Sequence, residues 1–263
     1  MKRLNEYGIG VSEETPFKQA AFGSLLEVIT RVSRSVMKRN KWPDSRFWIH
    51  DLNAARPFYP DEDGNTTGGS AVLGIEIARR LELNYRAYLC ELRQDNADAL
   101  QEHFAPDKRV AVLAGKAEET LPSYLAQAGN ARFGYVYADP NGPTQLPVAL
   151  LESIFQRRVY SCTDLIVYAA AGTLKRCVEA GIEVDDIDTF RKRINKRFWL
   201  VREPRGKNGQ QWTFLVGTNW DAFPQLTKQG FYRLDTPDGQ EIWRDLSLTR
   251  KQAAAQTQPS FFS

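Results

Sequence analysis

The segment Asp139-Pro140-Asn141-Gly142 holds the residue types in this sequence that best suit chemistry. It directly follows the apolar run at residues 133–138, which predicts a buried strand. A carboxylate and rigid neighbouring carbonyls can accept hydrogen bonds from an exocyclic amine, which leaves the nitrogen lone pair directed at a methyl group. The alternative is a turn that ends the strand, with Asp139 as a cap. We assign catalysis to Asp139, Pro140 and Asn141, and a substrate contact to Gly142.

A second candidate region is the first strand of the chain, at residues 46–52, and the long loop that follows it. Glycines before a helix let a ligand approach the backbone and the helix N–H groups, and Ser70 is a candidate N-cap for a helix at residues 71–83. The loop contains acidic residues at 61–63, which would repel a dinucleotide but not a net positive sulfonium. The predicted cofactor contacts here are Asp51, Asn53, Gly68, Gly69 and Ser70.

The ends of the next two strands supply the remaining cofactor candidates. Glu91 ends the strand at residues 85–89, where a carboxylate can accept both hydroxyls of a ribose. Its alternative is a solvated residue at a strand end. Gly115-Lys116-Ala117-Glu118 follows the third strand, at the position expected for an adenine ring, so we predict contacts from Lys116 and Ala117.

Strands and helices alternate along the chain in a way that predicts an α/β fold with a mostly parallel sheet. Further strands are expected at residues 110–113 and 164–169, with helices at 96–104, 118–128, 146–156 and 186–194. Residues 197–202 and 211–217 then form β-rich runs around Asn208-Gly209, a strong hairpin signal. The prediction is a parallel sheet with helices on both faces and a C-terminal antiparallel hairpin, its ligand site at the carboxyl ends of the strands.

In this order the motifs resemble a known family. The run at residues 47–51, Gly68-Gly69-Ser70, Glu91 and the run at residues 137–142 look like the three-Cys-motif partner (TcmP-like) methyltransferases, over about residues 20–220. The resemblance implies the Rossmann-like class I methyltransferase fold and S-adenosylmethionine as cofactor. The first loop departs from that superfamily, because residues 53–57 lack the compact Gly-x-Gly turn.

Asp139-Pro140 is also similar to the Asp-Pro-Pro-aromatic motif of amino methyltransferases that modify adenine N6 or cytosine N4 in DNA. In that motif the aspartate binds the amine and the aromatic ring stacks on a flipped base. Here Asn141 and Gly142 take the third and fourth positions, so the motif has no stacking ring.

Three regions follow from these patterns. Residues 1–42 are expected to be an arm and an amphipathic helix at 17–41, residues 43–248 the methyltransferase-like α/β domain, and residues 249–263 a flexible tail. The helix ends in a basic tail of Arg34, Lys38, Arg39 and Lys41.

The segment at residues 191–207 is strongly basic and lies close to three tryptophans. Eight lysines and arginines stand in it, and Trp199, Trp212 and Trp220 are near in sequence. Basic side chains interleaved with aromatic rings could follow a phosphate backbone and stack on bases, although a solvated helix face with core tryptophans is the alternative. We predict nucleic acid as the substrate, contacted by Arg193, Arg197, Arg205 and Lys207.

The overall composition is that of a globular protein, with 263 residues and a net charge of +3 that says little about nucleic acid. The three cysteines and two histidines show no metal-ligand spacing, so no metal is expected. No signal peptide or membrane span is apparent, and we expect a cytoplasmic protein.

The leading hypothesis is an S-adenosylmethionine-dependent methyltransferase acting on an amino nitrogen of nucleic acid, with DNA adenine N6 as the first choice. One alternative is a non-catalytic methyltransferase-like module that binds nucleic acid or a partner protein. Another is a Rossmann enzyme that uses a different nucleotide, such as a nicotinamide dehydrogenase.

Overall fold

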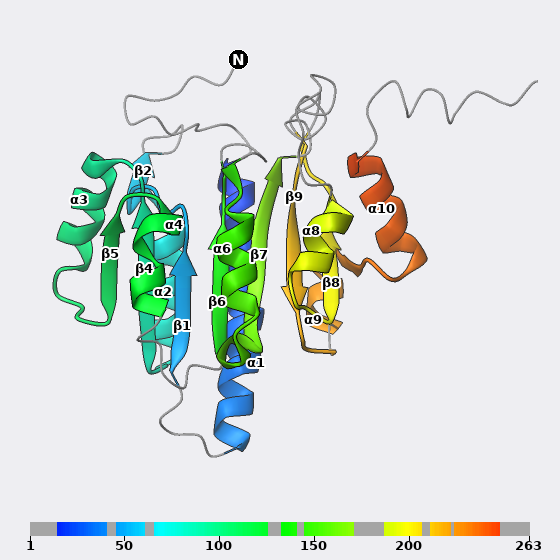
Figure 1. Cartoon of the computed structure of the whole chain (residues 1–263), viewed down its shortest axis with the longest axis horizontal. Coiled ribbons are helices and arrows are strands. Elements are labelled where there is room, and N and C mark those ends of the chain that lie inside the picture. Colours follow the sequence, from blue (N-terminus) through cyan, green and yellow to red (C-terminus); the bar gives the residue numbers. More distant parts are fainter. Residues whose placement is uncertain are drawn as a thin grey trace, which may run out of the picture.

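The computed structural model describes residues 15–40, 46–60, 66–125, 133–140, 145–170, 187–206, 211–221 and 224–247. Its centre is an 8-stranded sheet in the order β10-β8-β9-β7-β6-β1-β4-β5 (Figure 1). The strands are β1 (Phe47–Asp51), β4 (Tyr85–Glu91), β5 (Val110–Ala114), β6 (Phe133–Ala138), β7 (Cys162–Ala170), β8 (Phe198–Arg202), β9 (Trp212–Thr218) and β10 (Phe231–Arg233).

The five strands β5, β4, β1, β6 and β7 are parallel to one another. The chain builds outward from β1 to β5 and then returns to place β6 on the other side of β1. The strand order therefore reverses between β1 and β6, where ligands bind in open α/β sheets. Every strand expected from the sequence is present, because buried parallel strands are continuous apolar runs that stand out in a sequence.

The antiparallel part of the sheet is also confirmed. β9 pairs antiparallel with both β7 and β8. The sheet continues one strand further than expected, because the three-residue strand β10 pairs antiparallel with β8. The fold is thus α/β with a mostly parallel sheet and an antiparallel C-terminal part.

Helices cover both faces of the sheet (Figure 1). Side chains of one face form a core with α1 (Thr15–Arg39), α2 (Ser70–Arg80), α3 (Gln94–Phe104) and α9 (Pro224–Thr227). The other face packs against α4 (Ala117–Thr120), α5 (Pro122–Leu125), α6 (Val148–Phe155), α8 (Ile187–Arg193) and α10 (Pro237–Ser247), with the 3-10 helix η2 (Arg158–Tyr160) nearby.

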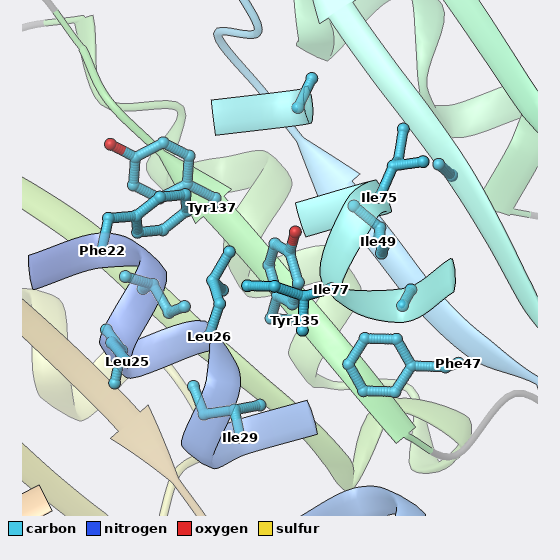
Figure 2. Close-up of a cluster of buried hydrophobic side chains, with 14 of the residues drawn as sticks. Phe22, Leu25, Leu26, Ile29, Phe47, Ile49, Ile75, Ile77, Tyr135 and Tyr137 are labelled. Carbon is cyan, nitrogen blue, oxygen red and sulfur yellow. The ribbon is translucent and has the colours of Figure 1, made fainter. Parts of the chain in front are cut away.

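Helix α1 is bound to the domain through an extensive apolar contact. Figure 2 shows its side chains, among them Phe22 and Leu26, against Tyr135 and Tyr137 of β6. The rings of Phe22 and Tyr137 have centroids 4.2 Å apart. Tyr135 and Tyr137 are two residues apart and so lie on the same face of β6, while Val136 between them faces the other core. The position of α1 beside the middle of the sheet matters for the site below.

One glycine makes the contact between the two central strands possible. Gly134 in β6 has φ +149°, and a Cβ there would lie 1.9 Å from the carbonyl oxygen of Trp48 in β1. Because that oxygen belongs to the backbone, it cannot move away without breaking the sheet. Only glycine fits at this position.

Three details of the sequence-based expectation are wrong. Where a helix was expected at residues 118–128, the described residues form two four-residue helices, α4 and α5, because Pro122 has no N–H to continue the first and instead begins the second. Residues 126–128 lie outside the described residues. The N-cap of α2 is Gly69 rather than Ser70, whose hydroxyl is used elsewhere. The first loop is partly ordered into a two-stranded antiparallel sheet of β2 (Phe58–Pro60) and β3 (Thr66–Gly68).

No helix in the described part of the chain has the length and the apolar character that crossing a membrane requires.

Candidate functional site

Three acidic side chains lie at the carboxyl ends of three adjacent parallel strands. Asp51 ends β1, Glu91 ends β4, and Asp139 directly follows β6. In the sheet Asp51 pairs with Leu89 on one side and Tyr137 on the other, so Glu91 and Asp139 are each two residues further along a neighbouring strand. The parallel sheet thus gathers three carboxylates that are far apart in the sequence at one rim, beside the point where the strand order reverses.

Asp51 is the most buried of the three, with 2% of its surface exposed. Its carboxylate accepts hydrogen bonds from the Ser70 hydroxyl at 2.5 Å and from the main-chain N–H of Asn53 at 3.1 Å. The pKa of Asp51 is raised to about 7, chiefly by burial and in part by the negative charges of Asp139 and Glu91, while these two hydrogen bonds lower it. A cation bound at this rim would relieve the repulsion among the three carboxylates, whereas a phosphate would increase it.

Glu91 is held in place by backbone and side-chain donors. Its Oε2 accepts the N–H of Ala55 at 2.8 Å, and its Oε1 accepts the N–H of Arg93 at 2.8 Å and the Asn96 side-chain amide at 3.4 Å. Ala55 has φ +57°, a left-handed conformation that costs free energy in a residue other than glycine. This strained residue is the one whose N–H binds Glu91. A carboxylate has about four acceptor positions. Three are used here, so one is open to a ligand hydroxyl, and a second hydroxyl would replace the long contact of the Asn96 amide.

Gly68 and Gly69 lie where the first loop returns to the sheet. Gly68 is paired with Phe58 in the small sheet, and the N–H of Gly69 donates to the carbonyl of Pro57 at 2.8 Å. A Cβ on Gly69 would lie 2.5 Å from the carbonyl oxygen of Arg56, so a larger residue does not fit. Gly69 caps α2 without a side-chain hydrogen bond, which leaves first-turn N–H groups of α2 with no side-chain acceptor.

Asp139 is joined to the first loop and to helix α1. Its main-chain N–H donates to the side-chain oxygen of Asn53 at 3.1 Å, and its carboxylate accepts the Tyr137 hydroxyl at 3.2 Å. The ammonium of Lys18, from the first turns of α1, forms an ion pair with the same carboxylate. That ammonium also lies 3.8 Å from the centre of the Tyr168 ring on β7.

Lys18 and Tyr168 are site residues that sequence reasoning missed. Lys18 stands at the start of an amphipathic helix, and no local signal says that this end of the helix lies beside a residue 121 positions away. Tyr168 could have been found, because it lies near the carboxyl end of an apolar strand that follows the one leading to Asp139. Pro140 lies at the rim, whereas Asn141 and Gly142 are outside the described residues.

Lys116 and Ala117 border the rim beyond Glu91. Ala114, the last residue of β5, pairs with Glu91, and the N–H of Gly115 donates to the Glu91 carbonyl at 2.9 Å. Lys116 then caps α4 and pairs loosely with Glu119 at 3.8 Å, while Ala117 is buried. Lys116 and Ala117 therefore lie at the same edge of the sheet as Glu91.

The predicted substrate contacts are distributed over the molecule. Arg205 reaches the rim, because it bridges to Trp212, the partner of the last residue of β7, and its guanidinium carbon lies 5.2 Å from the centre of the Phe17 ring. Arg193 is bound to Glu152 of α6 at 2.8 Å, on a helical face of the sheet. Arg197 precedes β8 at the opposite end. Lys207 lies outside the described residues.

Among the described residues, no three or more histidine, cysteine or acidic side chains are grouped in a way that could hold a metal ion.

Comparison with known proteins rests on structure alone. A scan against protein-family models finds no match. A search of curated proteins also finds no match. Among solved structures, protein LPL1258 from Legionella pneumophila str. Philadelphia 1, described with the family model DUF519, matches with TM-score 0.52 and 14% identity, covering 79% of this chain and 89% of that one.

Two other solved structures also match this chain. WbdD matches with TM-score 0.51 and 9% identity over 84% of this chain, which spans only 39% of WbdD. Precorrin-6y C5,15-methyltransferase from Geobacter metallireducens GS-15 matches with TM-score 0.40 and 13% identity, over 72% of this chain and 87% of that one. The fold is a Rossmann-like α/β fold with a mostly parallel sheet. At these identities the likeness concerns the fold.

Proposed function

We propose that this chain is an S-adenosylmethionine-dependent methyltransferase that modifies an amino nitrogen of nucleic acid, with adenine N6 of DNA as the first candidate. The observation that carries the proposal is the row of Asp51, Glu91 and Asp139 at the carboxyl ends of β1, β4 and β6. This row suits a cofactor that carries a positive charge and ribose hydroxyls, with the amine of the acceptor bound beside it. We also propose that this chain is related to the TcmP-like methyltransferases.

We assign each cofactor residue a role according to its position at the rim. Gly69 lets the ligand approach the start of α2, where N–H groups suit a carboxylate. Glu91, fixed by Ala55 and Arg93, accepts the ribose hydroxyls. Asp51 adds negative charge near the sulfonium. When bound, S-adenosylmethionine supplies an electrophilic methyl group, and Lys116 and Ala117 border its adenine.

Asp139 holds the acceptor. Its carboxylate accepts hydrogen bonds from the amine and keeps the nitrogen lone pair directed at the cofactor side of the rim. Asn53 fixes the main chain of Asp139, and Pro140 restricts the turn that follows. A nucleic-acid substrate is supported by Arg205, whose cationic group lies at the same rim beside the exposed ring of Phe17.

The first experiment measures cofactor binding by calorimetry with S-adenosylmethionine and S-adenosylhomocysteine. We expect micromolar affinity, and a loss of about tenfold or more in Glu91→Gln, because the neutral amide is a poorer acceptor for two hydroxyls. No heat at high micromolar ligand would exclude the methyltransferase function and favour a non-catalytic module. A fluorescence titration with NADH serves as the matched test of a dinucleotide, whose phosphates the acidic rim should reject.

The second experiment screens transfer of a tritiated methyl group to DNA, RNA and protein. Asp139→Ala should abolish transfer while cofactor affinity stays within about twofold, because Asp139 acts on the acceptor. Methylation that survives this change would show that the acceptor lies elsewhere. Transfer to protein alone would replace nucleic acid as the substrate class.

A further inference from the structure

The Asp-Pro segment lacks an aromatic ring of its own, but the neighbouring strand places one beside it. Ala138 of β6 pairs with Val167 of β7, so the residues that follow them, Asp139 and Tyr168, are neighbours across the two strands. Both carry their side chains toward the face covered by α1, since Lys18 of α1 contacts the two of them. Tyr168 is half-buried and packs with Trp212 and Phe214.

The contacts of the Lys18 ammonium indicate which kind of chemical group Asp139 and Tyr168 can bind together. The Asp139 carboxylate neutralises it, the face of Tyr168 lies 3.8 Å from it, and the Tyr137 hydroxyl donates to the same carboxylate at 3.2 Å. A carboxylate and an aromatic face together form a place for a nitrogen group with N–H donors. The chain's own lysine, with 20% of its side chain exposed, fills that place.

We propose that Asp139 and Tyr168 together form the acceptor-amine subsite, in which Tyr168 supplies the aromatic face and Lys18 is the occupant that an incoming amine displaces. The inference rests on the proposed function and adds the residue that recognises the acceptor. Asp139 accepts the N–H groups of the amine, and the Tyr168 ring stacks on the base that carries it.

The surroundings favour a base over a lysine side chain as the acceptor. Tyr168 contacts Trp212, which has the Arg202 guanidinium carbon 5.6 Å from its ring, and Arg205 lies over Phe17, the residue before Lys18. Cationic groups beside aromatic rings suit a phosphate backbone and its bases. An acceptor lysine would gain nothing from these arginines.

The test measures binding of single-stranded oligodeoxynucleotides of about twelve nucleotides to the full chain, by fluorescence anisotropy in saturating S-adenosylhomocysteine. One probe has a single adenine among thymines, and its partner has unsubstituted purine there, without the amino group. The quantity compared is the ratio of the two affinities, because a general change of charge affects both probes equally.

Four variants, including two controls, test the subsite. Lys18→Met should bind the adenine probe about threefold tighter or more, because the competing ammonium is gone, with a smaller change for the purine probe. Tyr168→Leu should lose about tenfold in affinity for both bases through lost stacking, and Tyr168→Phe should retain it. Lys108→Met, which removes an exposed positive charge from the loop before β5, is the matched control for Lys18→Met and should leave the ratio unchanged.

The outcomes separate this inference from the proposed function. Calorimetry with S-adenosylhomocysteine on the same proteins tests cofactor binding, which Lys18→Met should not alter. One outcome is that S-adenosylhomocysteine binds while the ratio of the two probe affinities is the same in Lys18→Met and in the wild type. That result would refute the acceptor-amine subsite and leave the proposed cofactor site intact. Absence of adenine-probe binding to Lys18→Met, or tighter binding of Nα-acetyl-lysine methylamide than of either oligonucleotide, would also overturn it.

Discussion

The main-chain N–H of Asp139 donates to the side-chain oxygen of Asn53 at 3.1 Å, across 86 residues of sequence. The N–H of Asn53 in turn donates to Asp51 at 3.1 Å. A single amide residue therefore joins the carboxylate that ends β1 to the turn that follows β6. This link makes the first loop and the Asp-Pro segment one structural unit, and it leads to the first prediction.

Asn53→Ala should loosen Asp139. We expect faster hydrogen exchange of the Asp139 amide and a loss of about 1 kcal/mol in the free energy of unfolding, because a part-buried hydrogen bond is lost. Hydrogen exchange followed by NMR measures the exchange rate of the Asp139 amide, and urea unfolding measures the free energy of unfolding. Unchanged exchange at Asp139 would show that this bond does not hold the turn in solution.

Asp51→Asn should change how stability depends on pH. Burial raises the folded-state pKa of Asp51 to about 7, above its ordinary value, so its contribution to stability is present below that ordinary value and lost as pH rises through about 7. The neutral amide has no such loss. The melting temperature of Asp51→Asn, relative to wild type, should therefore be higher at pH 8 than at pH 5.

Asp98→Asn is the control for this measurement, since Asp98 is exposed on α3. Its effect on the melting temperature should be small and similar at both pH values. A difference between Asp51→Asn and wild type that does not grow with pH would contradict the assignment of a buried, destabilising charge to Asp51.

Gly69→Ala and Gly23→Ala form a matched pair. A Cβ on Gly69 would lie 2.5 Å from the Arg56 carbonyl oxygen, whereas a Cβ on Gly23 in α1 meets nothing within 4 Å. Gly69→Ala should cost about 1–3 kcal/mol and weaken cofactor binding. Gly23→Ala should instead stabilise the protein by up to about 1 kcal/mol, because alanine is the better helix former. Denaturant unfolding checks both, and equal effects would refute the close approach.

Lys196→Met should destabilise the protein far more than Lys192→Met. Lys196 is 8% exposed, donates to the carbonyls of Tyr160 and Thr163, and balances the buried charge of Asp164. Burial lowers its pKa to about 8 despite that attraction. Removing the Lys196 ammonium leaves the buried Asp164 without a nearby compensating charge and should cost about 3 kcal/mol or more, while Lys192 is exposed on α8. Urea unfolding of both variants measures the difference, and similar values would contradict a structural role for Lys196.

The sequence by itself was enough to predict the strands, their parallel arrangement and the row of carboxylates. Buried parallel strands are continuous apolar runs, and their carboxyl ends necessarily share one edge. Asp51, Glu91 and Asp139 could therefore be grouped without coordinates. Short elements such as β10 and the pair β2–β3 escaped, because three residues carry too little pattern to be distinguished from a loop.

Only the tertiary structure decided what surrounds that row. Basic residues adjacent in the sequence separate in space: Arg205 reaches the rim, Arg193 pairs with Glu152, and Lys196 is buried. Lys18 reaches Asp139 because the apolar stripe of α1 packs along β6 and carries its first turns to the rim. Local sequence patterns set which face of a helix is apolar, but the partner of that face depends on how the whole chain packs its core.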